Sequence, residues 1–342
     1  MLVSSHRPLI YLRASLANVV DEQYDSHPSE RMTHMQHTFW STYDGSSPLD
    51  HAEADRTPEQ LAALWLDPSA RVLRLTSAGE TDGTQHALRP TALFDDELPF
   101  AEVQPLGVVY LGRVAEQPWF AIRDDAVSAK TARQLQSIRA ADLDDVSRHL
   151  LVSAHAVLNW QEATRFCSRC GGELRPFKGG FAALCGACGC QHFPRTDPAI
   201  IVAVLNQRDE LFLAHQSTWS AGRVSLLAGF VEAGESLTAA CHREIAEEAA
   251  LQLGSVRFLS SQPWPFPRSL MVGFVARAIG GVAGADEAGR VDGVELDHGA
   301  FYRREEVDAQ VASGELTLPG PGSIANRIIA AWLAGHLPDP EG

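Results

Sequence analysis

The chain has 342 residues, of which 45% are hydrophobic and 21% are charged, and its net charge is −15, from 43 acidic and 28 basic residues. This balance is typical of a globular protein, and it excludes a chain that is mainly disordered. A protein this acidic is not expected to be a general binder of nucleic acids or anionic membranes, since both need basic surfaces. The length predicts about two or three domains.

The sequence predicts neither a membrane span nor a signal peptide. The longest apolar runs, residues 199–205 and 270–276, are far shorter than the roughly 20 residues that a span requires. The first 20 residues include Arg7 and Arg13 and have no uninterrupted hydrophobic core. All six cysteines lie between residues 167 and 241, five of them within 24 positions, which favours metal binding over a disulfide scaffold. We therefore expect a reducing compartment and a cytoplasmic location.

The predicted elements follow in chain order. Residues 1 to about 120 carry no chemical motif, and 108–114 with 119–122 predict a strand pair around a turn at Gln117-Pro118, within an α+β domain. From 126 to 165, apolar residues recur at roughly helical spacing and predict one or two connecting helices. After the cysteines, strands are predicted at 199–205, 211–215 and 270–276, and helices at 236–251 and 323–334.

The last predicted helix has clear signals at both ends. Ser323 is a suitable N-cap after Pro321-Gly322, and Gly335 suits the C-terminal end. Ile324, Ile328 and Trp332 share one face, which we expect to be buried.

The cysteine cluster predicts a structural zinc site. Two Cys-x2-Cys pairs, Cys167/Cys170 and Cys185/Cys188, are separated by 14 residues and can supply four thiolates to a tetrahedral ion. Such a site is closed to substrate and stabilises a small ribbon without a core of its own. The alternative is a set of reduced, buried cysteines. Cys190 and His192 are competing candidates for the fourth ligand, and Cys241 is expected to be an inert buried thiol.

A second cluster of potential ligands lies on the helix predicted at 236–251. At 3.6 residues per turn, Glu244, Glu247 and Glu248 fall within an arc of about 100°. A solvated acidic face is the simpler explanation, but apolar residues share much of this side. Carboxylates crowded against a packed face indicate a hard divalent cation, and Mg²⁺ or Mn²⁺ suits oxygen ligands. Arg243 lies one turn from Glu247 and can reach back to Glu235, which predicts that it orients the carboxylates.

Residues 261–269, SQPWPFPRS, alternate prolines with aromatic residues. Three prolines forbid a helix and remove donors from a sheet ladder, so we predict a stiff extended loop that presents Gln262, Trp264 and Phe266. The alternative is a purely structural loop that its aromatic side chains hold in place.

These motifs together resemble a known family. The carboxylate segment is similar to the Nudix box, G-x5-E-x7-R-E-U-x-E-E-x-G-U, where U is a bulky aliphatic residue. One position departs from the box, because its glycine is Ala250 here, and a left-handed alanine costs about 1–2 kcal/mol. The segment 261–269 resembles the signature that follows the box in bacterial NADH pyrophosphatases. The matching box residues are Gly229, Glu235, Arg243, Glu244, Ile245, Glu247, Glu248 and Leu251.

The resemblance implies an α+β architecture, with a Nudix α/β/α sandwich, an inserted zinc ribbon and an N-terminal degenerate Nudix-like domain. The expected domains are residues 1–125 (N-terminal Nudix-like domain), 126–165 (helical connector), 166–195 (zinc ribbon) and 196–335 (catalytic Nudix domain). It also implies a homodimer, one structural Zn²⁺ per chain and catalytic Mg²⁺ or Mn²⁺.

The activity that the resemblance implies is hydrolysis of the pyrophosphate of NADH or NAD⁺ to nicotinamide mononucleotide and AMP, together with removal of the NAD cap from RNA 5′ ends. Glu244, Glu247 and Glu248 would hold the metal ions, and by similarity Glu295 would be a further ligand. Arg243 and Glu235 complete the expected catalytic set. By similarity, residues of the nicotinamide side, some of them reaching in from a partner subunit, are Phe230, Phe193, Ile201, Gln262 and Ala325.

Two alternatives remain open at the level of sequence. One is a Nudix hydrolase of another diphosphate such as ADP-ribose, against which the SQPWPFPRS segment argues. The other is a non-enzymatic zinc-ribbon adaptor with a decayed Nudix domain, against which the intact Glu244, Glu247 and Glu248 argue. A chain this acidic is expected to bind the RNA body weakly and in a salt-sensitive way.

Overall fold

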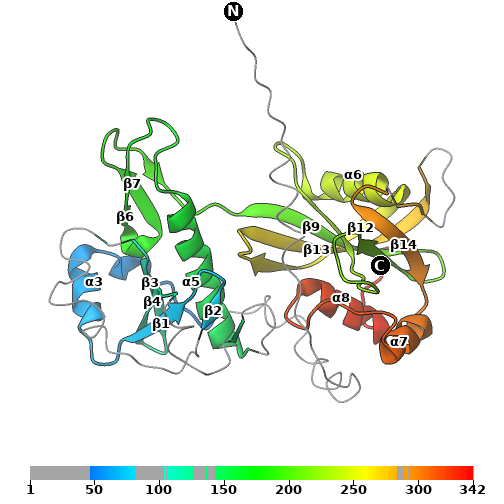
Figure 1. Cartoon of the computed structure of the whole chain (residues 1–342), viewed down its shortest axis with the longest axis horizontal. Helices are drawn as coiled ribbons and strands as arrows, with labels where there is room; N and C mark the ends of the chain where they lie inside the picture. Colours follow the sequence, from blue (N-terminus) through cyan, green and yellow to red (C-terminus); the bar gives the residue numbers. More distant parts are fainter. Residues whose placement is uncertain are drawn as a thin grey trace, which may run out of the picture. The chain divides into compact units, whose positions relative to one another are not determined.

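The structure, a computed structural model, describes residues 47–81, 104, 106–125, 136–137 (backbone alone), 143–282, 289–291 and 293–341. The chain divides into two compact units (Figure 1). The N-terminal unit comprises Trp40–Asp197 and Pro263–Arg268, and the C-terminal unit contains Pro198–Gln262 and Ser269–Gly342. Within the described residues, no helix combines the length and the apolar character that crossing a membrane requires.

The N-terminal unit is built on a three-stranded sheet in the order β1-β4-β3. Strand β1 (Arg71–Leu75) is parallel to β4 (Gln117–Arg123), and β4 is antiparallel to β3 (Val108–Val114). Helix α3 (Pro58–Trp65) starts at the N-cap Thr57 and contributes to the core beneath the sheet. Short elements complete this part: η3 (Glu53–Asp55) and the pair of β2 (Glu80–Thr81) with β5 (Gln136–Ser137).

The strand pair predicted at 108–114 and 119–122 is confirmed, but the predicted turn is wrong. The turn lies at Ala115 and Glu116, whose φ angles of 47° and 66° are left-handed, and Pro118 lies inside β4. Pairing between β1 and β4 begins at Trp119, so Pro118 has no partner on β1. Its missing N–H therefore costs no hydrogen bond between these two strands.

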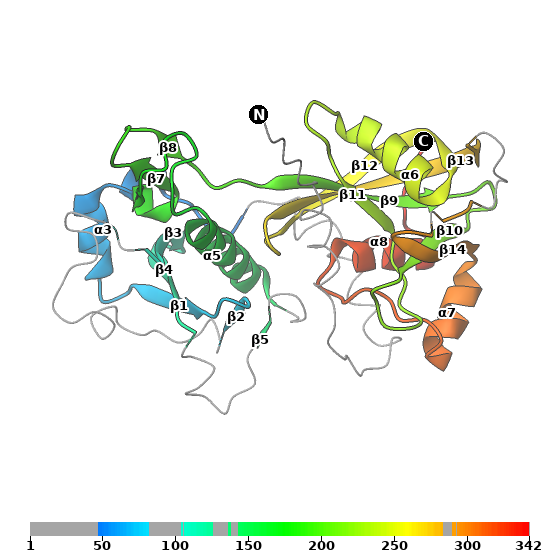
Figure 2. The same cartoon turned by 45° about the horizontal axis from the view of Figure 1, so that its top comes forward.

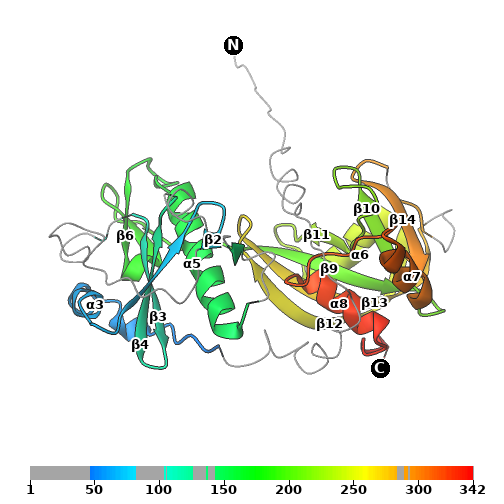
Figure 3. The same ribbon diagram turned by 60° about the horizontal axis from the view of Figure 1, so that its bottom comes forward.

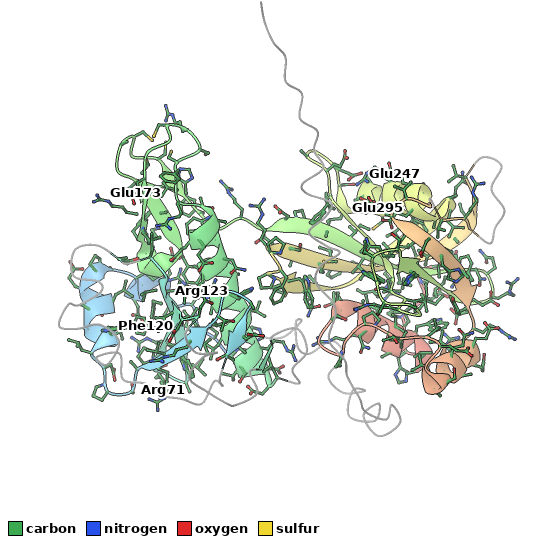
Figure 4. The ribbon with its side chains drawn as sticks, in the orientation of Figure 1. Arg71, Phe120, Arg123, Glu173, Glu247 and Glu295 are labelled. Carbon is green, nitrogen blue, oxygen red and sulfur yellow. The ribbon has the colours of Figure 1, made fainter. Side chains whose placement is uncertain are left out.

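Helix α5 (Asp145–Ala163) packs on this sheet (Figure 2). It starts where Asp144 accepts a hydrogen bond from the Ser147 amide. Arg123 of β4 bonds to Glu162 and Asn159 of α5, and Figure 4 labels it beside that helix. The helical prediction for 126–165 therefore holds over α5. Most of 126–142 lies outside the described residues, but 136–137 forms strand β5, so a helix there was wrong.

The cysteine-containing segment folds as a small antiparallel sheet in the order β6-β7-β8. Its strands are β6 (Leu174–Phe177), β7 (Ala182–Cys185) and β8 (Gln191–His192), with η5 (Lys178–Gly180) between the first two. One side packs against Trp160 of α5 in a small core. We call residues 165–195 the ribbon, which starts one residue before the predicted bound because the Leu174 amide bonds to the Arg165 carbonyl.

The C-terminal unit contains a sheet in the order β12-β13-β9-β10-β14, and β11 pairs with β9 away from this path. The strands are β9 (Asp197–Leu205), β10 (Leu211–Gln216), β11 (Leu227–Phe230), β12 (Leu251–Trp264), β13 (Ser269–Gly281) and β14 (Leu296–Tyr302). All three strands predicted in this region are present, and the observed strands extend beyond the predicted bounds.

Helices α6 (Leu237–Ala249) and α8 (Ile324–Leu333) cover opposite faces of this sheet (Figures 1 and 3). Strand β13 shows why: Val272 and Phe274 belong to the core with α6, whereas a Cβ at Gly273 would meet Ile324 and Ile328 of α8 at 3.0–3.1 Å. This two-sided packing gives the predicted α/β/α sandwich. Helix α7 (Arg304–Ser313) follows β14.

The helix ends refine the sequence predictions. Ser323 is the N-cap of α8, its hydroxyl accepting from the Asn326 amide, as predicted. Helix α6 ends at Ala249 rather than at Leu251, because Ala250 is left-handed and Leu251 begins β12.

The proline-aromatic segment is the tip of a hairpin and not an extended loop. Strand β12 continues through Trp264, and β13 begins at Ser269. Pro263 is tolerated in β12 because this strand is the edge of the sheet, where a missing N–H leaves no neighbouring strand unpaired. Residues Pro263–Arg268 belong to the N-terminal unit.

Candidate active site and zinc cluster

The ribbon brings the four predicted zinc ligands together. The sulfur atoms of Cys167, Cys170, Cys185 and Cys188 all lie within 4.8 Å of one another. The Cys167–Cys188 and Cys170–Cys185 sulfur distances are 3.7 and 3.5 Å. A tetrahedral zinc ion with Zn–S bonds of about 2.3 Å separates its sulfur ligands by about 3.8 Å. The donor set and its spacing therefore fit zinc.

The two competing candidates lie beside this cluster and not in it. His192 Nε2 is 3.3 Å from the sulfur of Cys167, and Arg169 contacts Cys190 at 3.5 Å. Burial alone would raise the pKa of the Cys167 thiol, but the Arg169 backbone N–H and the His192 ring lower this pKa to about 6. The thiolate is the form of cysteine that binds a metal. In the same cluster, backbone N–H groups act to lower the pKa values of Cys170 and Cys188, but both are raised because each thiol also donates to a neighbouring sulfur atom.

Helix α6 starts at a conventional cap and stops at a strained residue. The Ser236 hydroxyl accepts from the Ala239 amide at 3.1 Å. At the other end Ala250 has φ 54° and ψ 31°, the left-handed conformation that the box glycine would adopt without strain. The backbone N–H groups of Arg290 and Val282 bind the carbonyls of Ala249 and Ala250, which satisfies this end of the helix.

Arg243 is the centre of the polar network on α6. It donates twice to Glu235, from Nε at 2.9 Å and from Nη2 at 2.8 Å, and once to the carbonyl of Phe230 at 3.0 Å. Its other amino group lies 2.8 Å from Glu244 and 3.3 Å from Glu247. The reach to both Glu235 and Glu247 agrees with the sequence spacing. The Arg243 guanidinium lowers the pKa of Glu235, and the same bond raises the pKa of Arg243.

The three helix carboxylates differ in environment. Glu248 is buried, with 9% of its surface exposed, whereas the side chain of Glu247 is 57% exposed. Glu244 lies against β11, where a Cβ on Gly229 would come within 2.0 Å of its carboxyl carbon. A glycine at 229 therefore leaves the space that this carboxylate occupies. The box pattern includes Gly229 but does not by itself reveal this reason for it.

The carboxylates do not form a converging ligand set of the kind seen in the ribbon. In the described part of the chain, the four cysteines are the only group of three or more potential ligands whose atoms meet. Glu244 and Glu247 both contact Arg243 instead. Glu295 lies immediately before β14, and Figure 4 labels it together with Glu247 in the C-terminal unit. Their oxygen atoms are donors of the type that Mg²⁺ and Mn²⁺ prefer.

The residues predicted to contact nicotinamide are distributed over both units. Phe230 ends β11 and is half-buried, while Phe193 lies in the N-terminal unit and is 43% exposed. Ile201 and Ala325 are buried in the C-terminal unit. Gln262 is also buried, and its amide holds the start of α8, donating to the Gly322 carbonyl at 2.7 Å and accepting from the Ile324 amide at 2.6 Å.

The hairpin tip has contacts that the sequence did not predict. The Asn159 amide donates to the Pro265 carbonyl at 3.3 Å, and the rings of Phe266 and His155 are 4.8 Å apart. Arg268 and Asp197 form an ion pair of 2.7 Å. No local pattern in the sequence indicates these contacts, because they join residues far apart in the chain.

Cys241 behaves as predicted for an inert thiol. It is fully buried in the core between α6 and the sheet, and burial raises its pKa to about 12. A thiol with such a pKa stays protonated and unreactive at neutral pH.

Comparison with known proteins agrees with this geometry. The model of the NUDIX domain matches residues 195–317. The NAD-capped RNA hydrolase NudC of Mycobacterium bovis is 38% identical over 305 residues, covering 83% of this chain and 92% of the relative. NudC of Mycobacterium tuberculosis gives the same identity and coverage, and that of Stutzerimonas stutzeri is 33% identical over 72% of this chain and 84% of the relative. The chain therefore belongs to the Nudix family and, within it, to the group of hydrolases named NudC.

Proposed function

We propose that this protein hydrolyses the pyrophosphate bond of NADH and NAD⁺, giving nicotinamide mononucleotide and AMP, and that it removes the NAD cap from RNA 5′ ends. The observation that carries the proposal is the Arg243 network, because one guanidinium joins Glu235, Glu244 and Glu247 to each other and to the Phe230 carbonyl of β11. The names of the relatives supply the substrate class, since each is called an NAD-capped RNA hydrolase.

In the proposed reaction, a water oxygen bonds to one phosphorus of the pyrophosphate while the bridging oxygen leaves with the other phosphate. When bound, Mg²⁺ or Mn²⁺ would neutralise the charge of the pyrophosphate and lower the pKa of the attacking water. Glu244, Glu247, Glu248 and Glu295 are the residues that would hold these ions.

We assign the remaining roles in the reaction to individual residues of the chain. Arg243 is a positioning residue, because it fixes Glu235 and Glu244 and needs no contact with substrate. Glu248 is the residue whose loss we expect to be most damaging, since it is a buried carboxylate on this face. Phe230 and Phe193 are the half-buried and exposed aromatics that can stack on nicotinamide. The buried Ile201, Gln262 and Ala325 are the other residues that the family resemblance assigns to the nicotinamide side.

We further propose one structural zinc ion per chain, held by the four ribbon cysteines, and a homodimer. Sedimentation velocity tests the assembly, with a dimer expected near twice the chain mass of 37.1 kDa. A monomer at micromolar concentration would contradict the dimer without affecting the reaction.

Chromatography of the products tests the reaction itself. NADH, NAD⁺, ADP-ribose and an NAD-capped RNA are each incubated with the protein and Mg²⁺ or Mn²⁺. We expect AMP and reduced nicotinamide mononucleotide from NADH. Cleavage of ADP-ribose with NADH untouched would replace the proposed substrate by the alternative one. Absence of metal-dependent turnover with all four would leave the non-enzymatic adaptor.

A further inference from the structure

The ribbon has the opposite charge to the chain as a whole. Residues 165–195 contain five basic residues, Arg165, Arg169, Arg175, Lys178 and Arg195, and a single acidic one, Glu173, in a protein of net charge −15. All five basic residues are exposed. The overall charge argued against a basic binding surface, but the charge is segregated. A local cationic surface can therefore attract a polyanion that the rest of the protein repels.

Strand register defines the outer face of the ribbon. Arg175 pairs with Leu184, Leu184 pairs with Gln191, and directly opposed residues of antiparallel strands share a face. Phe166 is bridged to Glu173, which lies two residues before Arg175 and thus on the same face. The opposite face carries the neighbouring residues, which form the core with Trp160. We call Phe166, Glu173, Arg175, Leu184 and Gln191 the outer ribbon face.

This face presents apolar surface to solvent next to a cation without an acidic partner. Phe166 is 66% exposed and Leu184 is 41% exposed, high values for large hydrophobic residues. No ion pair links Arg175 to any carboxylate among the described residues, although Glu173 shares its face, and Figure 4 labels that glutamate on the ribbon. An exposed aromatic ring, Phe166, and an arginine without an ion pair in the described part of the chain, Arg175, are the two kinds of group that bind single-stranded nucleic acid, because bases stack on rings and phosphates bind cations.

We propose that the outer ribbon face binds the single-stranded RNA segment that follows the cap. This inference rests on the proposed function for its substrate, capped RNA, and it adds a second recognition element that is separate from the carboxylate site. Single strands fit better than duplexes, since a ring such as Phe166 can stack only on an unpaired, accessible base. Arg175 would contact the backbone phosphate.

Binding of an uncapped single strand tests this surface without catalysis. The probe is a 5′-hydroxyl RNA of 15 nucleotides, labelled at its 3′ end, and anisotropy is measured with the zinc-loaded full-length protein at several KCl concentrations. The variant is Phe166→Ala/Arg175→Ala. Its matched control is Phe258→Ala/Arg208→Ala, which removes an exposed ring and an exposed arginine from the C-terminal unit.

We expect the ribbon variant to raise the Kd by at least about tenfold, because the loss of one stacked base alone weakens binding about fivefold or more. The slope of log Kd against log salt should fall by about 0.7, because the variant neutralises one phosphate fewer. The control should change the Kd by less than about twofold. Leu184→Glu is a second variant that adds a repelling charge to the same face, and it should weaken binding even if the double variant loses its zinc.

Turnover separates this inference from the proposed function. In both ribbon variants, kcat/KM for free NADH should stay within about twofold of the wild type, while KM for NAD-capped RNA rises. Equal RNA affinity in wild type and ribbon variants would overturn the inference and leave NADH hydrolysis intact. A ribbon variant that changes the oligomeric state while RNA affinity is unchanged would assign the face to a second copy of the chain. Absence of NADH hydrolysis in the wild type would instead reject the proposed function.

Discussion

In the ribbon, four sulfur atoms lie within 4.8 Å of one another, whereas on α6 the carboxylates of Glu244 and Glu247 share the guanidinium of Arg243. Both regions were predicted from sequence as metal sites. They differ in whether the fold brings the potential metal ligands together. Tight backbone turns gather the four sulfur atoms of the ribbon, whereas carboxylates on one helix face repel one another and need a cation between them. A closed thiolate site suits a structural ion, and a site with exposed carboxylates suits an ion that must also reach a substrate.

The largest effect of a substitution is expected at the four-cysteine cluster of the ribbon. Cys185→Ser removes a buried thiol of the proposed zinc site, and structural zinc in small domains contributes about 10–16 kcal/mol of apparent binding free energy. We expect zinc content, measured by metal analysis, to fall from one per chain to nearly none, with loss of the ribbon's thermal transition. Cys241→Ala is the control, since this thiol lies in the other unit and should leave the zinc in place. Full zinc occupancy in Cys185→Ser would contradict the assignment.

On helix α6, Arg243→Lys tests whether the guanidinium of Arg243 positions the neighbouring carboxylates. A lysine cannot make the two parallel bonds to Glu235, and loss of a residue that orients metal ligands typically reduces activity about 10–100-fold. We expect a lower kcat for NADH, with the loss partly offset at high Mn²⁺. Arg113→Lys, which weakens an ion pair of 2.7 Å with Asp55 in the other unit, should leave kcat unchanged. Equal kcat in both variants would show that Arg243 does not organise the site.

The same ion pair makes a pH prediction. The pKa of Glu235 is lowered in the folded protein, chiefly by its bonds to Arg243. Its stabilising contribution is therefore complete above the ordinary glutamate pKa of about 4.3 and is lost as the pH falls through the lowered folded value. Urea unfolding should show Glu235→Gln less stable than wild type at pH 7, with the difference shrinking below about pH 4. A difference that is constant from pH 7 to pH 3 would rule out this linkage.

The smallest expected effect concerns the end of α6. Ala250 is left-handed, and relieving that strain with glycine should outweigh the backbone entropy that glycine adds. We expect Ala250→Gly to raise the free energy of unfolding by about 1 kcal/mol with little change in kcat. Thermal or urea unfolding measures it. Destabilisation would mean that the alanine side chain makes a contact that compensates its backbone conformation.

Features that depend on short motifs were predicted correctly from the sequence. Both Cys-x2-Cys pairs, the reach from Arg243 to Glu235 and the cap of α8 depend on short spacings that helix and turn geometry fix. The pairing of strands that lie far apart in the sequence was harder to predict. The turn at Ala115-Glu116 was placed two residues late because proline is a strong turn signal, and Pro118 is tolerated inside β4 only because of where its pairing with β1 starts.

The proline-aromatic segment was mispredicted for a related reason. Its prolines argued against a strand, but the edge position of β12, which no local pattern reveals, allows Pro263 to remain in the sheet. Likewise Gln262 looked like a presented side chain, and the fold uses its amide to hold the start of α8.

Hydrolysis of the NADH pyrophosphate by the carboxylate face of α6 is tested most directly by Glu248→Gln. The substitution keeps the size of a buried side chain and replaces its acidic group by an amide, with Glu305→Gln on α7 as an exposed control. We measure kcat for AMP release from NADH at saturating Mg²⁺ or Mn²⁺, and confirm folding from the melting curve. We predict a loss of at least about 100-fold in Glu248→Gln and wild-type rates in Glu305→Gln. Wild-type turnover in folded Glu248→Gln would contradict the role of this face in hydrolysis.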